Sequence, residues 1–150
     1  MTNVYDVPAK ELIDEVAKKL KEDKSIQMPE QNAFSRTGVS RENSPENPDW
    51  WYVRCASIMR KIYVKNVIGI EHLRAEYGGK RNRGSKPHKA RSGSGTIVRR
   101  AVQQLEAAGY VTKMRGKGRM LTGKGRSFMD NISLDVQKKT GSSYPGIEKY

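Results

Sequence analysis

Residues 96–122, TIVRRAVQQLEAAGYVTKMRGKGRMLT, decide the fold because they join an amphipathic helix to a β-hairpin. Over 96–108 the apolar residues recur at helical spacing and would form one buried face. Gly109 would end this helix. The segments Tyr110–Met114 and Arg119–Thr122 then flank a basic, glycine-containing turn, which predicts two strands of a hairpin.

Residues 50–65, WWYVRCASIMRKIYVK, predict a second helix, which Asp49 could cap. Its apolar residues fill a wide arc of the helical wheel, which is typical of a helix at the centre of a core. Cys55 lies inside that arc, so we expect a buried, unreactive thiol. The narrow opposite stripe, which we expect to face outward, carries Arg54, Ser57, Lys61 and Lys65.

Three further helices complete the prediction. The first starts at Asp6-Val7-Pro8 and is expected to carry the i,i+4 ion pairs Asp14–Lys18 and Glu15–Lys19. A short helix over 71–77 is stopped by glycines, and the last helix opens at Thr122 or Gly123.

This order of elements predicts a mainly α fold. We expect a winged helix-turn-helix with about five helices around the central apolar helix and a small β-hairpin wing. The length suits one domain over 1–150. Within it we expect a long polar loop at 23–48, a basic extended loop at 78–95 that its ligand would order, and a loose tail at 140–150.

The charge is distributed unevenly along the chain. Lysine and arginine total 29 against 16 acids, a net charge of +13. Residues 1–49 carry a net −3 and residues 50–150 a net +16, and Glu106 is the only acid between 77 and 129. A surface that serves only solubility mixes the two signs, whereas a long block of one sign suits phosphates. The chain is therefore predicted to bind nucleic acid.

The candidate RNA-binding residues lie on the central helix, the basic loop, the helix over 96–108 and the wing. They are Arg54, Arg60, Lys61, Lys65, Lys80, Arg81, Arg83, Lys86, His88, Lys89, Arg91, Arg99, Arg100, Lys113, Arg115, Lys117 and Arg119. Arg60 lies off the outward stripe, so a structural ion pair is an alternative role for it. Trp50, Trp51 and Tyr77 are candidates for base stacking, with closure of the core as the alternative.

Several other classes of protein are excluded or disfavoured. One cysteine and two histidines rule out a disulfide scaffold and a cysteine-rich zinc site. We expect no enzyme, cofactor or metal: no acid–base pair stands out, and Gly125 replaces the Ser/Thr that a P-loop needs after its lysine. No apolar run approaches the roughly 20 residues that span a bilayer, which predicts a soluble intracellular protein.

The basic loop favours RNA over DNA as the partner. About eighteen residues separate two helices that a DNA-binding helix-turn-helix would join by roughly three or four. Such a loop would obstruct docking in the major groove, but it suits threading into folded RNA. Two alternatives remain open: a winged-helix DNA-binding regulator, and a protein-interaction module that uses the acidic N-terminal segment and the 23–48 loop. With no obvious dimerisation helix, we expect a monomer when the protein is free.

Several short segments, in order and spacing over roughly residues 4–138, also resemble a known family. They are Thr37-Gly38, Pro48–Ser57, Arg60-Lys61, Tyr77-Gly-Gly79, Gly93-Ser94, Val98–Ala101, Leu105-Glu106 and Gly118–Thr122. On these segments the chain is similar to the archaeal–eukaryotic (e-type) family of small-subunit ribosomal protein nineteen, and more so to archaeal members.

The resemblance implies a mostly helical winged-helix fold and a cytoplasmic protein in the head of the small ribosomal subunit. It implies contact with small-subunit rRNA and neighbouring ribosomal proteins and, in eukaryotic members, a role in rRNA maturation and subunit assembly. For RNA contact it implies Arg54, Arg60 and Arg99. The chain departs from the family at Cys55, where alanine is usual, and over 83–92, where the residues differ but the charge is kept.

Overall fold

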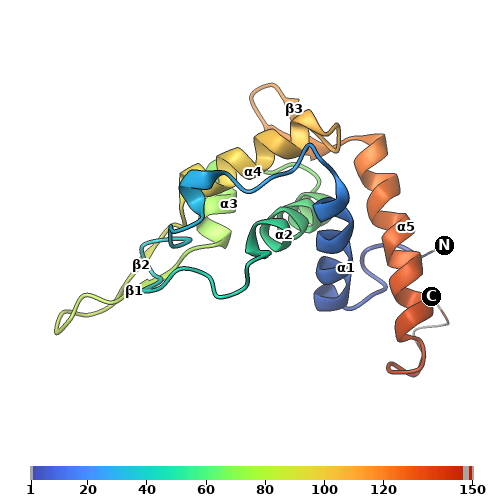
Figure 1. Cartoon of the computed structure of the whole chain (residues 1–150), viewed down its shortest axis with the longest axis horizontal. Helices are drawn as coiled ribbons and strands as arrows, with labels where there is room; N and C mark the ends of the chain where they lie inside the picture. The colour runs from blue at the N-terminus through green and yellow to red at the C-terminus, as the bar shows by residue number, and fades with distance from the viewer. Residues whose placement is uncertain (1, 147–148, 150) are drawn as a thin grey trace.

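Five helices and two antiparallel β-ribbons make up the part of the chain that the computed structural model describes, residues 2–146 and 149 (Figure 1). The helices are α1 (Ala9–Glu22), α2 (Trp50–Lys65), α3 (Ile70–Glu76), α4 (Gly95–Ala107) and α5 (Gly123–Thr140). The strands are β1 (Gly79–Arg81), β2 (Lys89–Arg91), β3 (Val111–Met114) and β4 (Gly118–Leu121). β1 pairs with β2 and β3 with β4. The predicted mainly α fold with a hairpin wing is confirmed.

Helix α2 lies at the centre of the core, as predicted from its apolar arc. It packs against α1, α4, α5 and β4. Trp51, Cys55 and Ile62 have no exposed surface. Burial raises the pKa of the Cys55 thiol to about 12, so the thiol stays neutral at physiological pH. Each fully buried aliphatic side chain contributes about 1.5–3 kcal/mol, which makes α2 the main apolar support of the fold.

Side-chain caps start α4 and α5, whereas α1, α2 and α3 begin without one. Ser94 accepts a hydrogen bond from the backbone N–H of Ile97 at the start of α4, and Thr122 accepts one from Gly125 at the start of α5. Asp49 is the N-cap residue of α2, as predicted, but its side chain makes no cap hydrogen bond. Its carboxylate pairs instead with Lys21 of α1 at 2.9 Å, because packing brings that ammonium group beside it.

The ion pairs of α1 also differ from the expected i,i+4 pairs. Glu15 pairs with Lys18 at 2.9 Å and with Lys139 of α5 at 3.0 Å, and Lys19 pairs with Asp135 of α5 at 3.0 Å. The prediction considered neighbours on one helix only. In the folded chain α5 packs along α1 and supplies closer partners.

The wing is tied to the chain between α2 and α3. The backbone N–H of Ile68 donates to the Arg119 carbonyl at 3.0 Å, and the N–H of Arg119 donates back at 2.9 Å. The approach needs glycine at position 118, where φ is +126° and a Cβ would lie 2.6 Å from the Ile68 carbonyl oxygen. The wing is thereby held at a set position beside α2.

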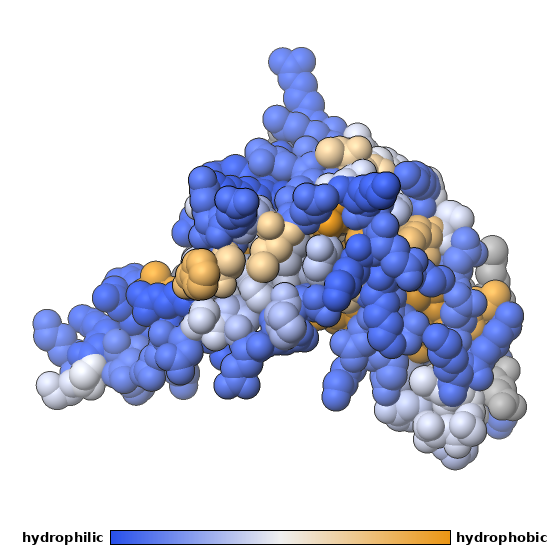
Figure 2. Space-filling model, in the orientation of Figure 1, coloured by the Kyte–Doolittle hydropathy of each residue, from blue (hydrophilic) through white to orange (hydrophobic). Residues whose placement is uncertain are grey.

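The basic segment over 78–95 is not the extended loop that the sequence predicted. Its two arms pair as β1 and β2, in the register Gly79↔Arg91 to Arg81↔Lys89. Antiparallel pairing satisfies backbone groups without requiring a core, which explains how so polar a segment can be regular. All of residues 80–92 are exposed, and the ribbon projects away from the helices with a largely hydrophilic surface (Figures 1 and 2).

The loop over 23–48 is polar and long, as expected, and it contains one 3-10 turn, η1 (Glu30–Asn32). Ile26 and Asn32 are buried, so parts of this loop are anchored to the body. The predicted loose tail over 140–150 falls partly outside the described residues. Of its described part, Tyr144 donates a hydrogen bond to Glu11 of α1 at 3.0 Å. Among the described helices, none is long and apolar enough to cross a membrane.

Candidate nucleic-acid interface

Three segments that are distant in the sequence meet at the root of the β1–β2 ribbon. The backbone of Gly38 forms a β-bridge with Gly93. The N–H of Ser94 donates to the Thr37 carbonyl at 3.0 Å, and the N–H of Gly93 donates to the Arg74 carbonyl at 2.9 Å. Segments 37–38, 77–79 and 93–94 carried part of the family resemblance, and in the structure they lie together. They attach the ribbon to α3, to α4 and to the 23–48 loop.

The predicted cations of the ribbon, the outer face of α4 and the wing tip are open to solvent. These exposed residues are Lys80, Arg81, Arg83, Lys86, His88, Lys89, Arg91, Arg99, Lys113, Arg115 and Lys117. Within the described part of the chain, none of them forms an ion pair with a carboxylate. Their charge therefore remains available to an anionic partner.

A second group of predicted cations forms ion pairs with carboxylates of the protein itself. Lys61 and Lys65 of α2 both pair with Glu76 of α3, Lys61 at 2.9 Å. These two ammonium groups lower the pKa of the Glu76 carboxyl to about 2. Arg119 pairs with Glu106 at 2.8 Å. The acids lie on other elements, so the wheel of α2 alone did not reveal the pairs.

Arg100 and Arg60 occupy two further environments. Arg100 is half-buried on α4 and donates to Gln31 and Asn32 of the η1 turn. Arg60 is half-buried on α2, and its Nε has no hydrogen-bond partner among the described residues. Its predicted alternative role, an ion pair, finds no carboxylate partner in the described part of the chain.

The two tryptophans close the core. Trp51 is fully buried and donates from Nε1 to Gln104 of α4 at 2.9 Å, so its ring is not open to a base in this conformation. Trp50 is 8% exposed and packs edge-to-face on Trp51, with ring centroids 5.6 Å apart. The tryptophan pair thus matches the predicted alternative, closure of the core.

Tyr77 is held between α2 and the root of the ribbon. Its hydroxyl donates to Ser57 at 2.7 Å, and the Arg54 guanidinium lies over its ring, 3.9 Å from the centroid. Arg54 is therefore not the freely outward cation that the helical wheel predicted. Burial lowers its pKa, and the neighbouring charge of Arg41 adds to that effect.

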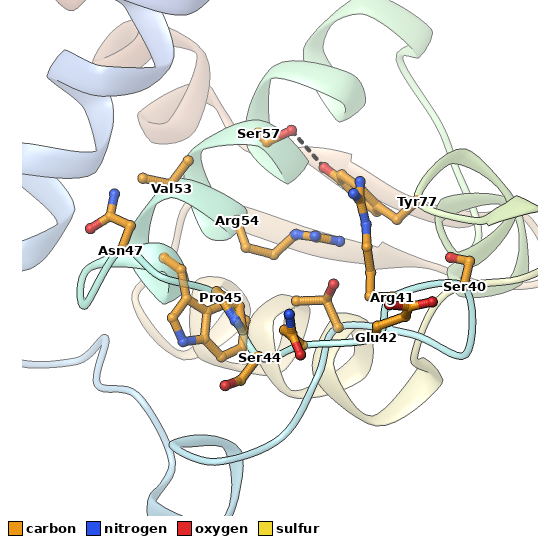
Figure 3. Close-up of a pocket in the computed structure, with 13 residues that line it drawn as sticks. Ser40, Arg41, Glu42, Ser44, Pro45, Asn47, Val53, Arg54, Ser57 and Tyr77 are labelled. Carbon is orange, nitrogen blue, oxygen red and sulfur yellow. Dashed lines mark hydrogen bonds between the residues drawn. The ribbon is translucent and has the colours of Figure 1, made fainter.

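A cavity of about 700 Å³ opens beside this arginine (Figure 3). One wall is α2, with Trp50, Val53, Arg54 and Ser57, and the other is the loop between Thr37 and Asn47. Figure 3 shows the side chains of Arg54 and Arg41 extending from these opposite walls toward the Tyr77 ring. The cavity combines two cations, one carboxylate, aromatic surface and several hydroxyl and amide groups.

Arg41 and Phe34 are two further candidate site residues that the sequence did not predict. Arg41 lines the cavity, and Phe34 is 94% exposed just after the η1 turn. A solitary phenylalanine in a polar loop was the available signal for Phe34. For Arg41 no sequence signal existed, because its neighbours come from α2 and from Tyr77.

Nearly the whole chain matches one family of known proteins. The family model of ribosomal protein S19e matches residues 3–139. The chain belongs to this family. A small ribosomal subunit protein eS19 of Thermoplasma acidophilum is 44% identical over 150 residues, which cover 100% of this chain and 99% of the relative.

Other relatives of the same name extend the family across archaea and eukaryotes. The protein of Aeropyrum pernix is 43% identical over 152 residues and is covered to 99%. The protein of Entamoeba histolytica is 41% identical over 138 residues, which cover 92% of this chain and 88% of the relative. The resemblance stated from the sequence is confirmed, and the family is one of ribosomal rather than catalytic proteins.

Proposed function

We propose that this chain is a structural component of the small ribosomal subunit, and that it binds small-subunit rRNA as one winged-helix domain. One observation carries the proposal: the ribbon, the outer face of α4 and the wing tip present exposed cations that have no carboxylate partners in the described part of the chain. Membership of the S19e family supplies the ribosomal context.

The mechanism is electrostatic, with geometry supplied by the core. Lysine and arginine side chains neutralise phosphates and release the counterions that had condensed on them. Phosphate contacts fix the position of the protein on the RNA, and shape accounts for most of the recognition of folded RNA. The projecting ribbon suits entry between RNA helices, whereas it would obstruct docking of α4 in the major groove of DNA.

The proposal includes a place in the head of the subunit, in the cytoplasm, and support of subunit assembly and rRNA maturation. The basis for this part is the family resemblance. Neighbouring ribosomal proteins are further partners, and the exposed Phe34 of the 23–48 loop supports a contact there. The free protein is proposed to be a monomer that requires no cofactor.

Replacing Arg99 and Arg100 by alanine tests the proposal. The double variant should bind a transcript of small-subunit rRNA more weakly, and its log–log salt slope should fall by about one for each phosphate that is no longer neutralised. Electrophoretic titration at several salt concentrations measures both quantities. Gln103→Ala, on the same exposed face of α4, is the neutral control and should leave the affinity and slope unchanged.

Two outcomes would contradict the proposal. If the double variant binds rRNA with unchanged affinity, these two arginines of α4 do not contribute to rRNA binding. Tighter binding of wild-type protein to duplex DNA than to rRNA would favour the winged-helix DNA-binding regulator. A sucrose gradient after a high-salt wash checks the cellular prediction: the chain should remain with small subunits.

A further inference from the structure

We propose that the cavity between α2 and the loop 37–47 receives a single unpaired nucleotide of the bound RNA. Arg54 would contact the phosphate, and the base would lie against the apolar part of the lining, from Trp50 and Val53. The inference rests on the proposed function and deepens it, because it assigns one part of the RNA to a cavity whose lining is not only charged.

Arg54 is the cation of the cavity that would bind the phosphate. Arg54 and Arg41 both line the cavity, so two cations face the same space, and burial lowers the pKa of Arg54. In the described part of the chain no carboxylate pairs with Arg54, whose guanidinium lies on the face of Tyr77. A guanidinium stacked in this way is oriented with its N–H groups unpaired, and its planar fork matches the oxygens of a phosphate.

The size and lining of the cavity suit one nucleotide. Its volume of about 700 Å³ is far more than one anion needs and is typical of a site for a small organic molecule. Ser40, Ser44 and Asn43 supply hydroxyl and amide groups on the loop wall. Trp50 and Val53 supply apolar surface on the helix wall. Phosphate, sugar and base of one nucleotide would each meet a matching part of the lining.

The cavity lies beside the root of the ribbon. Its loop wall contains Thr37, whose carbonyl accepts from Ser94 at the root of the ribbon. An RNA strand that follows the cations of the ribbon toward the body would therefore reach the mouth. Unpaired nucleotides are the parts of folded RNA that proteins most often extrude and enclose. An acidic peptide would satisfy Arg54 but would leave the apolar part of the cavity unused.

One lining group opposes the proposed ligand. Glu42 lines the cavity from the loop, and its carboxylate would repel a phosphate. Glu42 is exposed, so solvent screens this repulsion. This repulsion offers a test, because removing the Glu42 charge should strengthen binding. Few structural disturbances would strengthen binding.

The direct test is a titration of the free full-length protein, followed by NMR of the Arg54 Nε–H and of the backbone of the loop. The probes are the four nucleoside monophosphates, inorganic phosphate and an acetylated glutamate peptide. We expect saturable shifts with at least one nucleotide, at least about fivefold tighter than with phosphate. Equal binding of phosphate, or binding of the peptide alone, would overturn the proposal in favour of a bare anion site or a protein partner.

Variants test the same site with RNA. The probes are single strands of about eight nucleotides and a duplex with the same number of phosphates. Ser44→Trp, on the exposed loop wall, fills the cavity, and Arg54→Lys keeps the charge but removes the planar fork. Each should weaken single-strand binding by about tenfold and duplex binding much less. Glu42→Gln should strengthen single-strand binding.

Arg99→Ala is the matched control, since it removes an arginine outside the cavity. It should weaken single-strand and duplex binding equally. If Arg99→Ala weakens binding while the three cavity variants leave it unchanged, the inference is overturned and the proposed function stands. If the wild type binds none of these RNAs, the proposed function fails as well. Thermal melting of each variant distinguishes a damaged site from a damaged fold. The stronger binding expected for Glu42→Gln is informative in itself, because a damaged fold would weaken binding.

Discussion

Arg54, Arg99 and Arg119 carry the same side chain, yet the structure gives each a different role. Arg99 is exposed, Arg119 is paired with Glu106, and Arg54 is stacked on Tyr77 beside the cavity. The environment rather than the residue type decides which charge is available to RNA. A basic composition predicts that phosphates are bound, but it does not identify the arginines that bind them.

Backbone conformation at single glycines is the second feature at this scale. Gly118→Ala should lower the free energy of unfolding by about 2 kcal/mol or more, because the new Cβ would lie 2.6 Å from the Ile68 carbonyl oxygen and φ is +126°. Chemical denaturation monitored by tryptophan fluorescence measures the loss. Gly116→Ala is the control: φ is +74°, but a Cβ there would have open space, so only about 1 kcal/mol should be lost. If both variants lose the same free energy of unfolding, the close approach of Gly118 to the Ile68 carbonyl does not contribute to stability.

At the scale of elements, several ion pairs connect one helix with another, in addition to the pairs Glu15–Lys18 and Glu71–Arg74 within single helices. Glu15 connects α1 with α5 through Lys139, and Glu76 connects α3 with α2 through Lys61. The sequence predicted helix pairs within α1, because the i,i+4 rule uses only the spacing on one helix. The actual partners depend on the packing of α5 and α3.

The Glu76 pairs make a prediction about pH. The pKa of Glu76 is lowered from 4.5 to about 2, so the charged form is the one stabilised by folding. This contribution is present above pH 4.5 and is lost as the pH falls through about 2. Glu76→Gln should therefore lower the melting temperature slightly at pH 7 and reduce the wild-type decline between pH 4.5 and 2. The effect is small because solvent screens the pairs.

Calorimetric melts across this pH range provide the measurement. Glu71→Gln is the matched control, since Glu71 is an exposed α3 acid that pairs with Arg74 of its own helix and forms no ion pair with α2 in the described part of the chain. Identical pH profiles for the wild type and Glu76→Gln would show that the pairs contribute nothing to the α2–α3 contact.

At the scale of the whole molecule, the basic ribbon is attached to the apolar body, but we expect it to contribute little to the free energy of unfolding. Residues 80–92 of the ribbon are all exposed, whereas its root is attached by the Gly38–Gly93 bridge and by Arg74. Replacing residues 82–88 by Asn-Gly, which closes a two-residue hairpin, should change the free energy of unfolding by no more than about 0.5 kcal/mol.

The same replacement should weaken binding to an rRNA transcript and lower the salt slope by about 0.9 for each phosphate that the shortened ribbon no longer neutralises. Denaturation and salt-dependent titration of one preparation measure both effects. A control that keeps the segment but replaces Asn82 and Ser85 by alanine should leave the affinity unchanged. A large loss of stability in the shortened variant would show that the tip belongs to the folded core.

The sequence by itself determined the helices, the wing and the total charge, because periodicity, capping residues and glycine positions act over a few neighbouring residues. It also predicted the family and the central position of α2. Only the tertiary structure decided that the 78–95 segment is a paired ribbon, that Lys61 and Lys65 face Glu76, and that Arg54 lines a cavity with the loop 37–47. These features depend on contacts between residues far apart in the chain, and no local pattern encodes such contacts.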